Sequence, residues 1–399
     1  MRILVLSFYY QPDLCAGSFR ATALVKALQE KLPAGAQLDV LTTLPNRYST
    51  FSQAAPESEI VNGVHIHRVK LPEHKSGMVD QSKAFWHFAR SVLKLTKDVK
   101  YDLVVGTSSR LMTASLSAYI AHQHNAKLYL DIRDLFVDTV KDVLSRKITY
   151  FAKPLFSLVE YCTFNQANKI NLVSQGFKPY FDHRYPSKRC SFFTNGIDEE
   201  FIGESLDLNL NPELNLDLQP VNKQPISILY AGNIGEGQGL HMIIPLLAQQ
   251  MGSSVHFKLI GDGGRKVVLD KALLEKGLNN VEVFKPVNRE QLIQAYQHAD
   301  VLFLHLNDYE AFKKVLPSKI FEYAAMGKPI WAGVAGYAAE FIRAEVTNAA
   351  VFSPCDINEA KKSFSTLVLE KTQRNEFIAK FARINIMKKM ADDILSLVR

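Results

Sequence analysis

The chain has 399 residues, of which 47% are hydrophobic and 22% charged, which is typical of a soluble globular protein and excludes disordered and fibrous classes. This length exceeds what a single hydrophobic core usually supports, so we expect two domains. Lysine and arginine outnumber aspartate and glutamate by 47 to 40, an excess that favours anionic ligands but is too small to indicate a nucleic-acid-binding protein.

Through the first half of the chain, short apolar runs alternate with helical patterns. Runs such as residues 103–107 are apolar throughout, as expected for strands covered on both faces of a sheet. The regular alternation of strand and helix predicts a parallel sheet. The expected strands are 3–8, 38–42, 65–69, 103–107, 127–132, 170–173 and 191–194, and the expected helices are about 18–31, 80–98, 111–124, 147–168 and 175–182.

The composition changes after residue 198. Residues 206–225 are rich in Asn, Asp, Pro and Leu and lack sustained periodicity, which indicates a connection between domains. A second alternation follows, with strands expected within 226–232, 256–263, 281–287, 300–306, 329–334 and 349–354. We therefore predict an α/β protein with two Rossmann-like, doubly wound parallel-sheet domains that face each other across a cleft. The predicted parts are an N-terminal domain at 1–198, a linker at 199–225, a second domain at 226–371 and a C-terminal helix at 372–399 that packs toward the first domain.

The cysteines and the hydropathy indicate a cytoplasmic protein. The four cysteines lie far apart, without the spacing of a zinc site, and are expected to be reduced. No segment approaches the length of a membrane span.

Glycine-rich turns follow two strands of the second half. The segments "YAGNIGEGQGL" (230–240) and "LIGDGG" (259–264) each place several glycines at the carboxyl end of a strand. Open α/β sheets bind ligands at this edge, and glycine lets a ligand approach the backbone. Two interpretations remain open for each turn: phosphate binding, or a tight connection between strand and helix.

A buried helix with one charge in its apolar body follows the strand near residue 304. The segment "LPSKIFEYAAMGKPI" (316–330) begins a helix near Pro317 and ends it at Gly327. Glu322 lies in the middle of this body. It belongs either to a solvent-facing stripe or to a ligand site, in which the amides near Ser318 and the ammonium of Lys319 would receive a diphosphate and Glu322 would bind a ribose diol.

Five segments, in this order and spacing, are similar to the family-4 glycosyltransferases. They are residues 10–28 ("YQPDLCAGSFRATALVKAL"), 194–198 ("TNGID"), 230–240, 259–264 and 316–330, and they span nearly the whole chain. The resemblance implies the two-domain GT-B fold. It also implies a retaining, metal-independent glycosyltransferase that needs no cofactor and uses a UDP-sugar donor, with an N-acetylated amino sugar suggested by bacterial O-antigen and capsule enzymes. The implied acceptor is lipid-linked or an oligosaccharide.

The resemblance also assigns residues. Glu322 would bind ribose, and Ser318 and Lys319 the diphosphate, with Lys319 acting in catalysis. The base would lie near Pro286 and Val287, next to Asp262 and Gly263, and Gly17 would approach the diphosphate from the first domain. In the Gly-rich turn, Gly235, Asn233 and Gln238 complete the donor site. No metal site is expected.

Two departures from the family pattern concern this donor site. Asn233 and Gln238 stand where relatives often carry an Arg and a Lys that clamp the diphosphate. Lys314 stands where many relatives carry an acidic residue, eight positions before the ribose glutamate. The clamping charge would then come from Lys319, alone or with Lys314, Lys313 or Arg265, or the helix dipole would carry more of it.

Acceptor-side candidates follow a buried strand of the first half. In "YLDIRDLFVD" (129–138), Arg133 and Asp134 are the candidate catalytic groups, and the alternative is an internal Asp–Arg ion pair that fixes the loop. Residues 83–100 form a basic amphipathic helix, which either contacts an anionic membrane at the inner face of the cytoplasmic membrane or packs its apolar face on the sheet.

Three rival functions stay open. A nicotinamide-dependent enzyme is disfavoured because no G-x-G-x-x-G motif follows a strand. A nucleotide-sugar epimerase would act on the donor without an acceptor. A non-catalytic nucleotide-sugar-binding subunit is conceivable because of Lys314 and the missing clamp cations.

Overall fold

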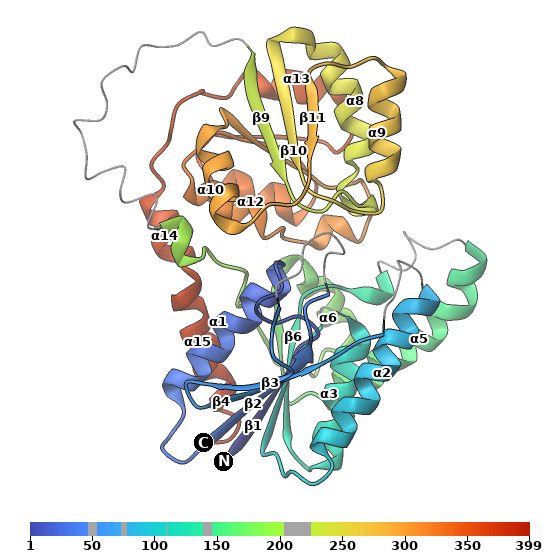
Figure 1. Ribbon diagram of the computed structural model, residues 1–399, viewed down its shortest axis with the longest axis vertical. Helices are drawn as coiled ribbons and strands as arrows, with labels where there is room; N and C mark the ends of the chain where they lie inside the picture. The colour runs from blue at the N-terminus through green and yellow to red at the C-terminus, as the bar shows by residue number, and fades with distance from the viewer. Residues whose placement is uncertain (47–53, 73–77, 109, 139–145, 203–224) are drawn as a thin grey trace. The chain divides into compact units, whose positions relative to one another are not determined.

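The computed structural model describes residues 1–46, 54–72, 78–108, 110–138, 146–202 and 225–399 (Figure 1). It has two compact units, one formed by Met1–Asn195 with Ile384–Arg399 and the other by Gly196–Arg383. Each unit is an α/β domain built on one sheet, which confirms the predicted fold class. Most of the predicted linker, 203–224, lies outside the described residues.

Unit 1 contains an eight-stranded sheet in the order β3-β4-β2-β1-β5-β6-β7-β8. Seven strands follow the predicted positions, and β3 was not predicted. β3 runs antiparallel to β4, so this one edge strand departs from the parallel order of the other strands. The cause is a tight turn at Asn62 and Gly63, both with positive φ, and an Asn-Gly pair is a strong hairpin signal. The strands are β1 (Arg2–Leu6), β2 (Gln37–Thr43), β3 (Ser58–Val61), β4 (Val64–Val69), β5 (Leu103–Thr107), β6 (Lys127–Ile132), β7 (Lys169–Leu172) and β8 (Cys190–Ser191).

The helices of unit 1 pack against this sheet. Strands such as β5 are buried over their whole length, because helices cover both faces of the sheet. The last helix of the chain also belongs here, since Met387, Met390 and Ile394 are fully buried and Asp393 accepts hydrogen bonds from Tyr129 and Ser191. The helices are α1 (Ala16–Lys31), α2 (Met78–Thr96), α3 (Leu111–Gln123), α5 (Arg146–Gln166), α6 (Lys178–Arg184) and α15 (Arg383–Leu395).

Unit 2 contains a six-stranded, wholly parallel sheet in the order β11-β10-β9-β12-β13-β14. Its core surrounds the fully buried Trp331, Phe257 and Phe303. The strands are β9 (Ile226–Ala231), β10 (Val255–Ile260), β11 (Val281–Phe284), β12 (Val301–His305), β13 (Ile330–Gly333) and β14 (Ala349–Phe352). The helices are α8 (Leu240–Met251), α9 (Lys266–Glu275), α10 (Arg289–His298), α11 (Lys319–Ala325), α12 (Tyr337–Glu345), α13 (Ile357–Phe364) and α14 (Asn375–Phe381).

The boundary after unit 2 lies at Arg383, twelve residues beyond the predicted 371. The reason is an aromatic cluster that joins α14 to α11 and α12. The ring of Phe381 lies 5.3 Å from that of Phe321 and 5.4 Å from that of Phe341, and Phe377 packs between them. Within the described parts of the chain, no helix is long and apolar enough to cross a membrane.

Candidate active site

The carboxyl edge of the unit 2 sheet brings the two glycine-rich turns into backbone contact. A Cβ atom on Gly261 would lie 1.8 Å from the carbonyl oxygen of Gly232, and one on Gly263 would lie 2.6 Å from that of Ile234. The amide of Ile234 donates to the carbonyl of Asp262 at 2.9 Å. A side chain at Gly261 or Gly263 would collide with the backbone of the neighbouring turn. Both glycines are therefore needed for the two turns to pack together.

Lys319 reaches over this paired turn from the start of α11. A Cβ on Gly232, whose φ is +154°, would lie 2.4 Å from Cε and 3.1 Å from Nζ of Lys319, so the glycine provides the space in which the lysine lies. Within the described ranges, the ammonium has no hydrogen-bond or ion-pair partner. Burial lowers the pKa of Lys319, and the nearby Glu322 carboxylate opposes this effect. A half-buried cation without a partner is a favourable place for an anionic ligand.

Glu322 is buried, with 7% of its surface exposed, so its assignment to a solvent-facing stripe is wrong. Its Oε2 atom accepts a hydrogen bond from the hydroxyl of Tyr296 at 3.1 Å. The fully buried Tyr296 comes from α10, which the sequence did not connect with this site. Glu322 is one turn along α11 from Lys319, so both charges belong to the same short helix.

The loop from β11 to α10 carries the predicted base-contact residues Pro286 and Val287, both half-buried. At its end Asn288 caps α10 by accepting from the amide of Gln291 at 2.9 Å. The next residue, Arg289, forms ion pairs with Asp198 and Glu200. Burial acts to lower the pKa of Arg289, but the carboxylates of Glu322, Asp198 and Glu200 together raise it. The positive charge of Arg289, at the end of this loop, therefore interacts with the carboxylate of Glu322.

The remaining donor-site residues predicted in unit 2 bond mainly within their own turns. Asn233 donates to the side-chain oxygen of Gln238 at 2.8 Å, and the amide of Gly235 donates to the same oxygen at 3.3 Å. The carboxylate of Asp262 accepts from the amide of Gly263 at 2.8 Å. These side chains shape the turns and add no positive charge.

The start of α11 differs from the prediction. The helix begins at Lys319 with Ser318 as its N-cap, so Pro317 lies outside it, and the Ser318 side chain makes no capping hydrogen bond. Since α11 has only seven residues, its dipole is a small contribution beside the full charge of Lys319. Lys314 lies in a 3₁₀ turn (Phe312–Lys314) and is half-buried.

Comparison with known sequences gives a family for this unit. Residues 216–383 match the model of the family described as glycosyl transferases group 1. The C-terminal unit belongs to this group.

The chain is 26% identical over 236 residues to the putative colanic acid biosynthesis glycosyl transferase WcaI of Escherichia coli K12, a match that covers 57% of this chain and 56% of WcaI. It is 21% identical to the lipopolysaccharide 1,2-N-acetylglucosaminetransferase of Salmonella typhimurium, over 57% of this chain and 61% of that one. The matches thus span little more than half of either relative.

Solved structures share the whole fold. HepE of Anabaena, determined with UDP and glucose, has 17% identity and a TM-score of 0.64, with 99% of each chain covered. WaaG, a glycosyltransferase involved in lipopolysaccharide biosynthesis, has 14% identity and a TM-score of 0.64, over 99% of this chain and 97% of that one. The fold is therefore GT-B, as predicted.

The group 1 unit contains a functional candidate that the sequence analysis missed. His305, at the end of β12, is fully buried and joins three loops of the site edge. Its Nδ1 atom lies 2.7 Å from the carbonyl oxygen of Gln238, and its Nε2 atom accepts from the amide of Cys355 at 3.1 Å. The two contacts fix the Nδ1–H tautomer of a neutral ring. Burial lowers the pKa of His305 to about 4, although the hydrogen bond to Gln238 opposes the shift.

We expect His305 to make unit 2 acid-sensitive. In the unfolded chain His305 takes up a proton as the pH falls below about 6.5, whereas in the folded chain it stays neutral down to about pH 4. Protonation therefore favours the unfolded chain, and the free energy of unfolding should fall by about 3 kcal/mol between pH 6.5 and pH 4. Urea unfolding at pH 7.0, 5.5 and 4.5, followed by the fluorescence of buried Trp331, measures this loss. His305→Asn should remove most of the pH dependence, whereas the exposed His298→Asn should retain it. Equal pH dependence in both variants would contradict the assignment.

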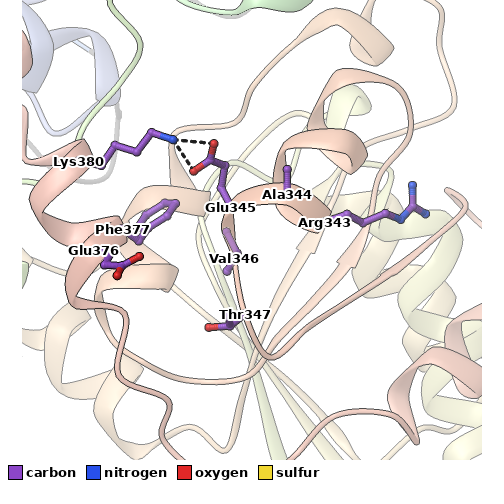
Figure 2. A pocket seen from close by; sticks show the side chains of 8 residues that line it. All are labelled: Arg343, Ala344, Glu345, Val346, Thr347, Glu376, Phe377 and Lys380. Carbon is purple, nitrogen blue, oxygen red and sulfur yellow. Dashed lines mark hydrogen bonds and ion pairs between the residues drawn. The ribbon is translucent and has the colours of Figure 1, made fainter.

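A cavity of about 350 Å³ lies elsewhere in the group 1 unit, between α12 and α14 (Figure 2). Lys380 bonds both carboxylate oxygens of Glu345 at 2.7 Å, and the Arg343 side chain points away from this pair. Thr347, which precedes β14, also lines the cavity, so it lies by the amino end of that strand. None of the predicted site residues lines this cavity.

In unit 1 the structure brings together two of the three predicted residues. Arg133 lies against Gly17 in the first turn of α1, where a Cβ on Gly17 would be 2.6 Å from Nη1 of the arginine. Asp134 is exposed. The internal ion pair considered as an alternative exists with other partners, because Asp131 pairs with Arg20 at 2.7 Å and both are almost completely buried. Arg133 is not needed for it.

Proposed function

We propose that this protein is a retaining glycosyltransferase that moves a sugar from a UDP-sugar to a lipid-linked or oligosaccharide acceptor in bacterial surface-polysaccharide synthesis. The observation that carries the proposal is the ammonium of Lys319, which has no partner among the described residues. It is held over the paired glycine turns and lies one helical turn from the buried Glu322. The resemblance to WcaI and to the Salmonella N-acetylglucosaminetransferase supports the acceptor class and suggests an N-acetylated amino sugar.

The proposed chemistry follows from this arrangement. The bond between the sugar C1 and the β-phosphate oxygen breaks, the acceptor oxygen forms its new bond to C1 on the same face, and the acceptor proton passes to the departing phosphate. Lys319 stabilises the negative charge that develops on the diphosphate, and Glu322 accepts from the ribose hydroxyls. No metal and no cofactor takes part in this scheme, since a fixed cation performs the neutralisation.

Calorimetric titration with a panel of nucleotides and nucleotide sugars tests the proposal. We expect UDP and at least one UDP-sugar to bind, and uridine to bind more weakly because it lacks the diphosphate. NAD binding without UDP binding would contradict it. Product analysis after incubation with donor alone separates the rivals: a net epimer would identify an epimerase. Donor binding with no transfer to any of a panel of saccharide and lipid-diphosphate acceptors would favour a binding subunit.

The proposed acceptor side includes peripheral contact of residues 83–100 with an anionic membrane at the inner face of the cytoplasmic membrane. Ala84, Phe88 and Val92 of α2 are buried, so part of the apolar face of this helix packs inward. Such packing was the alternative to membrane contact. Trp86 is nevertheless 73% exposed and Leu93 37% exposed. The exposed basic residues of the same helix are Lys83, Arg90 and Lys94, and the exposed Lys97 follows its last residue.

The helices beside α2 extend this apolar surface. α3 contacts both α2 and α5. Leu155 and Leu158 on α5 are 62% and 60% exposed, and Tyr119 on α3 is also exposed. Exposed apolar side chains next to lysines and arginines suit the interface of an anionic bilayer. This surface supports a lipid-linked acceptor.

We expect Trp86→Ser to weaken binding to vesicles that contain anionic phosphatidylglycerol by about tenfold, because an inserted indole loses its burial. Vesicle co-sedimentation at low and high salt measures the effect. The matched control is Leu274→Ser, which changes an exposed leucine of unit 2. Equal binding of the wild type to phosphatidylcholine vesicles and to anionic vesicles would contradict the electrostatic part of the proposal.

A further inference from the structure

Arg289, the first residue of α10, is held by a short segment near the start of unit 2. Its side chain is 18% exposed, and its guanidinium forms ion pairs with Asp198 and, at 3.5 Å, with Glu200. The guanidinium carbon also lies 4.5 Å from the centre of the ring of Phe201, which is fully buried. Three residues of the segment 198–201 therefore fix the position of this cation within unit 2.

The carboxylate of Asp198 is shared between Arg289 and a second arginine. Its Oδ1 atom lies 2.5 Å from Nε of Arg383, and its Oδ2 atom accepts from Nη2 of the same residue at 3.2 Å. Burial acts to lower the pKa of Arg289, and the charge of Glu322 opposes this effect at least as strongly as the charge of Asp198 does. The charge of Arg289 therefore acts on Glu322 as well as on the segment that holds it.

Two cations compete for the carboxylate of Glu322. Lys319 precedes it by three residues on α11, a spacing at which a lysine and a glutamate can pair. Among the described residues, however, no ion pair joins the two. The carboxylate accepts instead from the hydroxyl of Tyr296, whose ring stacks on Phe201 at 6.0 Å between centres. Tyr296 and Arg289 both belong to α10, so this helix supplies a hydrogen bond and a positive charge that compete with Lys319.

We propose that Arg289 is a positioning residue of the donor site, which draws the carboxylate of Glu322 toward α10 and so leaves the ammonium of Lys319 for the diphosphate. Arg289 acts through Glu322 and does not touch the donor. The inference deepens the proposed function and rests on it, because it explains how a lysine three residues from a glutamate keeps its charge available. It also gives a role to Asp198 of the "TNGID" segment, which holds Arg289 in place.

The ratio of the affinities for UDP and for uridine measures this role, since only UDP carries the diphosphate. In Arg289→Met the carboxylate of Glu322 should pair with Lys319. The ratio should then fall about tenfold, within the usual range for coupling between residues of one charge network. A partly unfolded variant would bind both ligands less and leave the ratio unchanged. Arg289→Lys keeps a positive charge and should recover part of the ratio. The matched control is Arg343→Met, which removes an exposed arginine of unit 2 and should keep the wild-type ratio.

A double-mutant cycle shows whether Arg289 acts through Glu322. In the Glu322→Gln background no carboxylate remains at this position to pair with Lys319, so Arg289→Met should change the ratio little. An equal fall in both backgrounds would mean that Arg289 acts directly on the phosphates, and would overturn the proposal. An unchanged ratio in Arg289→Met alone would overturn it as well.

Two tyrosines are the other titratable groups near Lys319. The hydroxyl of Tyr230 would lie 3.1 Å from a Cβ on Gly232, beside the lysine, and it donates to the carbonyl oxygen of Asn233 at 2.7 Å. The hydroxyl of Tyr323, on α11, accepts from the amide of Ala231 at 3.3 Å, and burial raises its pKa. Both hydroxyls are neutral, so the charges that act on Lys319 are those of Glu322 and Arg289.

The pH dependence of UDP binding provides a measurement that a merely structural role would not change. Burial, opposed by the charge of Glu322, lowers the pKa of Lys319, and the charge of Arg289 lowers it further. Without Arg289 this pKa should rise, so the loss of UDP affinity at high pH should move to a higher pH in Arg289→Met and stay in place in Arg343→Met. A loss at the same pH in both variants would contradict the proposal.

The inference and the proposed function can fail separately. UDP binding that depends on Lys319 but not on Arg289 would remove the inference alone. A wild type that binds neither UDP nor any UDP-sugar would contradict the proposed function itself.

Discussion

Lys319→Met should reduce sugar transfer by about 10²- to 10³-fold, the range for removal of one group that stabilises developing charge in a transition state. The reason is geometric: the ammonium lies in the space left by Gly232 and has no partner among the described residues, so its charge is available to the departing diphosphate. The loss should depend on the phosphates. UDP should bind more weakly, whereas uridine, which has none, should bind as before.

The pH dependence of UDP binding provides a second measurement on Lys319. Burial lowers the pKa of this lysine, and only its protonated form attracts a diphosphate. Affinity should therefore be lost as the pH rises through the lowered pKa, below the ordinary 10.5, and this limb should be absent from Lys319→Met.

Lys328→Met is the matched control for both measurements. Lys328 is a second lysine of unit 2, also half-buried, in the loop that leads into β13 at its amino end. Calorimetry and initial rates for the two variants would refute the role of Lys319 if both lost the same activity.

Glu322→Ala should lower the affinity for UDP by about 1–3 kcal/mol, as expected when a buried polar contact is removed. Glu322 is 7% exposed, and one oxygen of its carboxylate is bonded to Tyr296. Because this bond already fixes the side chain, the carboxylate can accept a hydrogen bond from a ribose hydroxyl with little further loss of conformational entropy. The sharper measurement is the ratio of the affinities for UDP and for 2′-deoxy-UDP. The wild type should prefer the ribonucleotide, and the variant should lose the preference.

Two further variants exclude a general effect on the fold. Glu322→Gln keeps an oxygen for Tyr296 but loses the charge and one acceptor, so the ribose preference should fall without loss of stability. Tyr296→Phe leaves the carboxylate intact and should keep the preference. If the preference survives in Glu322→Ala, Glu322 does not contact the ribose.

Much of the fold and part of the candidate site could be predicted from local sequence patterns. Fully apolar runs such as 103–107 become central strands, because a strand covered on both faces needs apolar residues at every position. The glycines at 232, 261 and 263 lie in turns that a side chain would block. Such turns can be predicted from a few adjacent residues of the sequence. The position of Lys319 before Glu322 is likewise a local spacing on one helix.

Other features depend on contacts between distant parts of the chain. The burial of Glu322 depends on Tyr296, and the neutral state of His305 depends on the backbone at 238 and 355. The end of unit 2 at Arg383 depends on the packing of Phe381 against Phe321. Periodicity and spacing report what a segment does along its own length. Which charges remain without a counter-ion is decided by neighbours that only the tertiary structure supplies, because Coulomb and hydrogen-bond energies depend on separation in space.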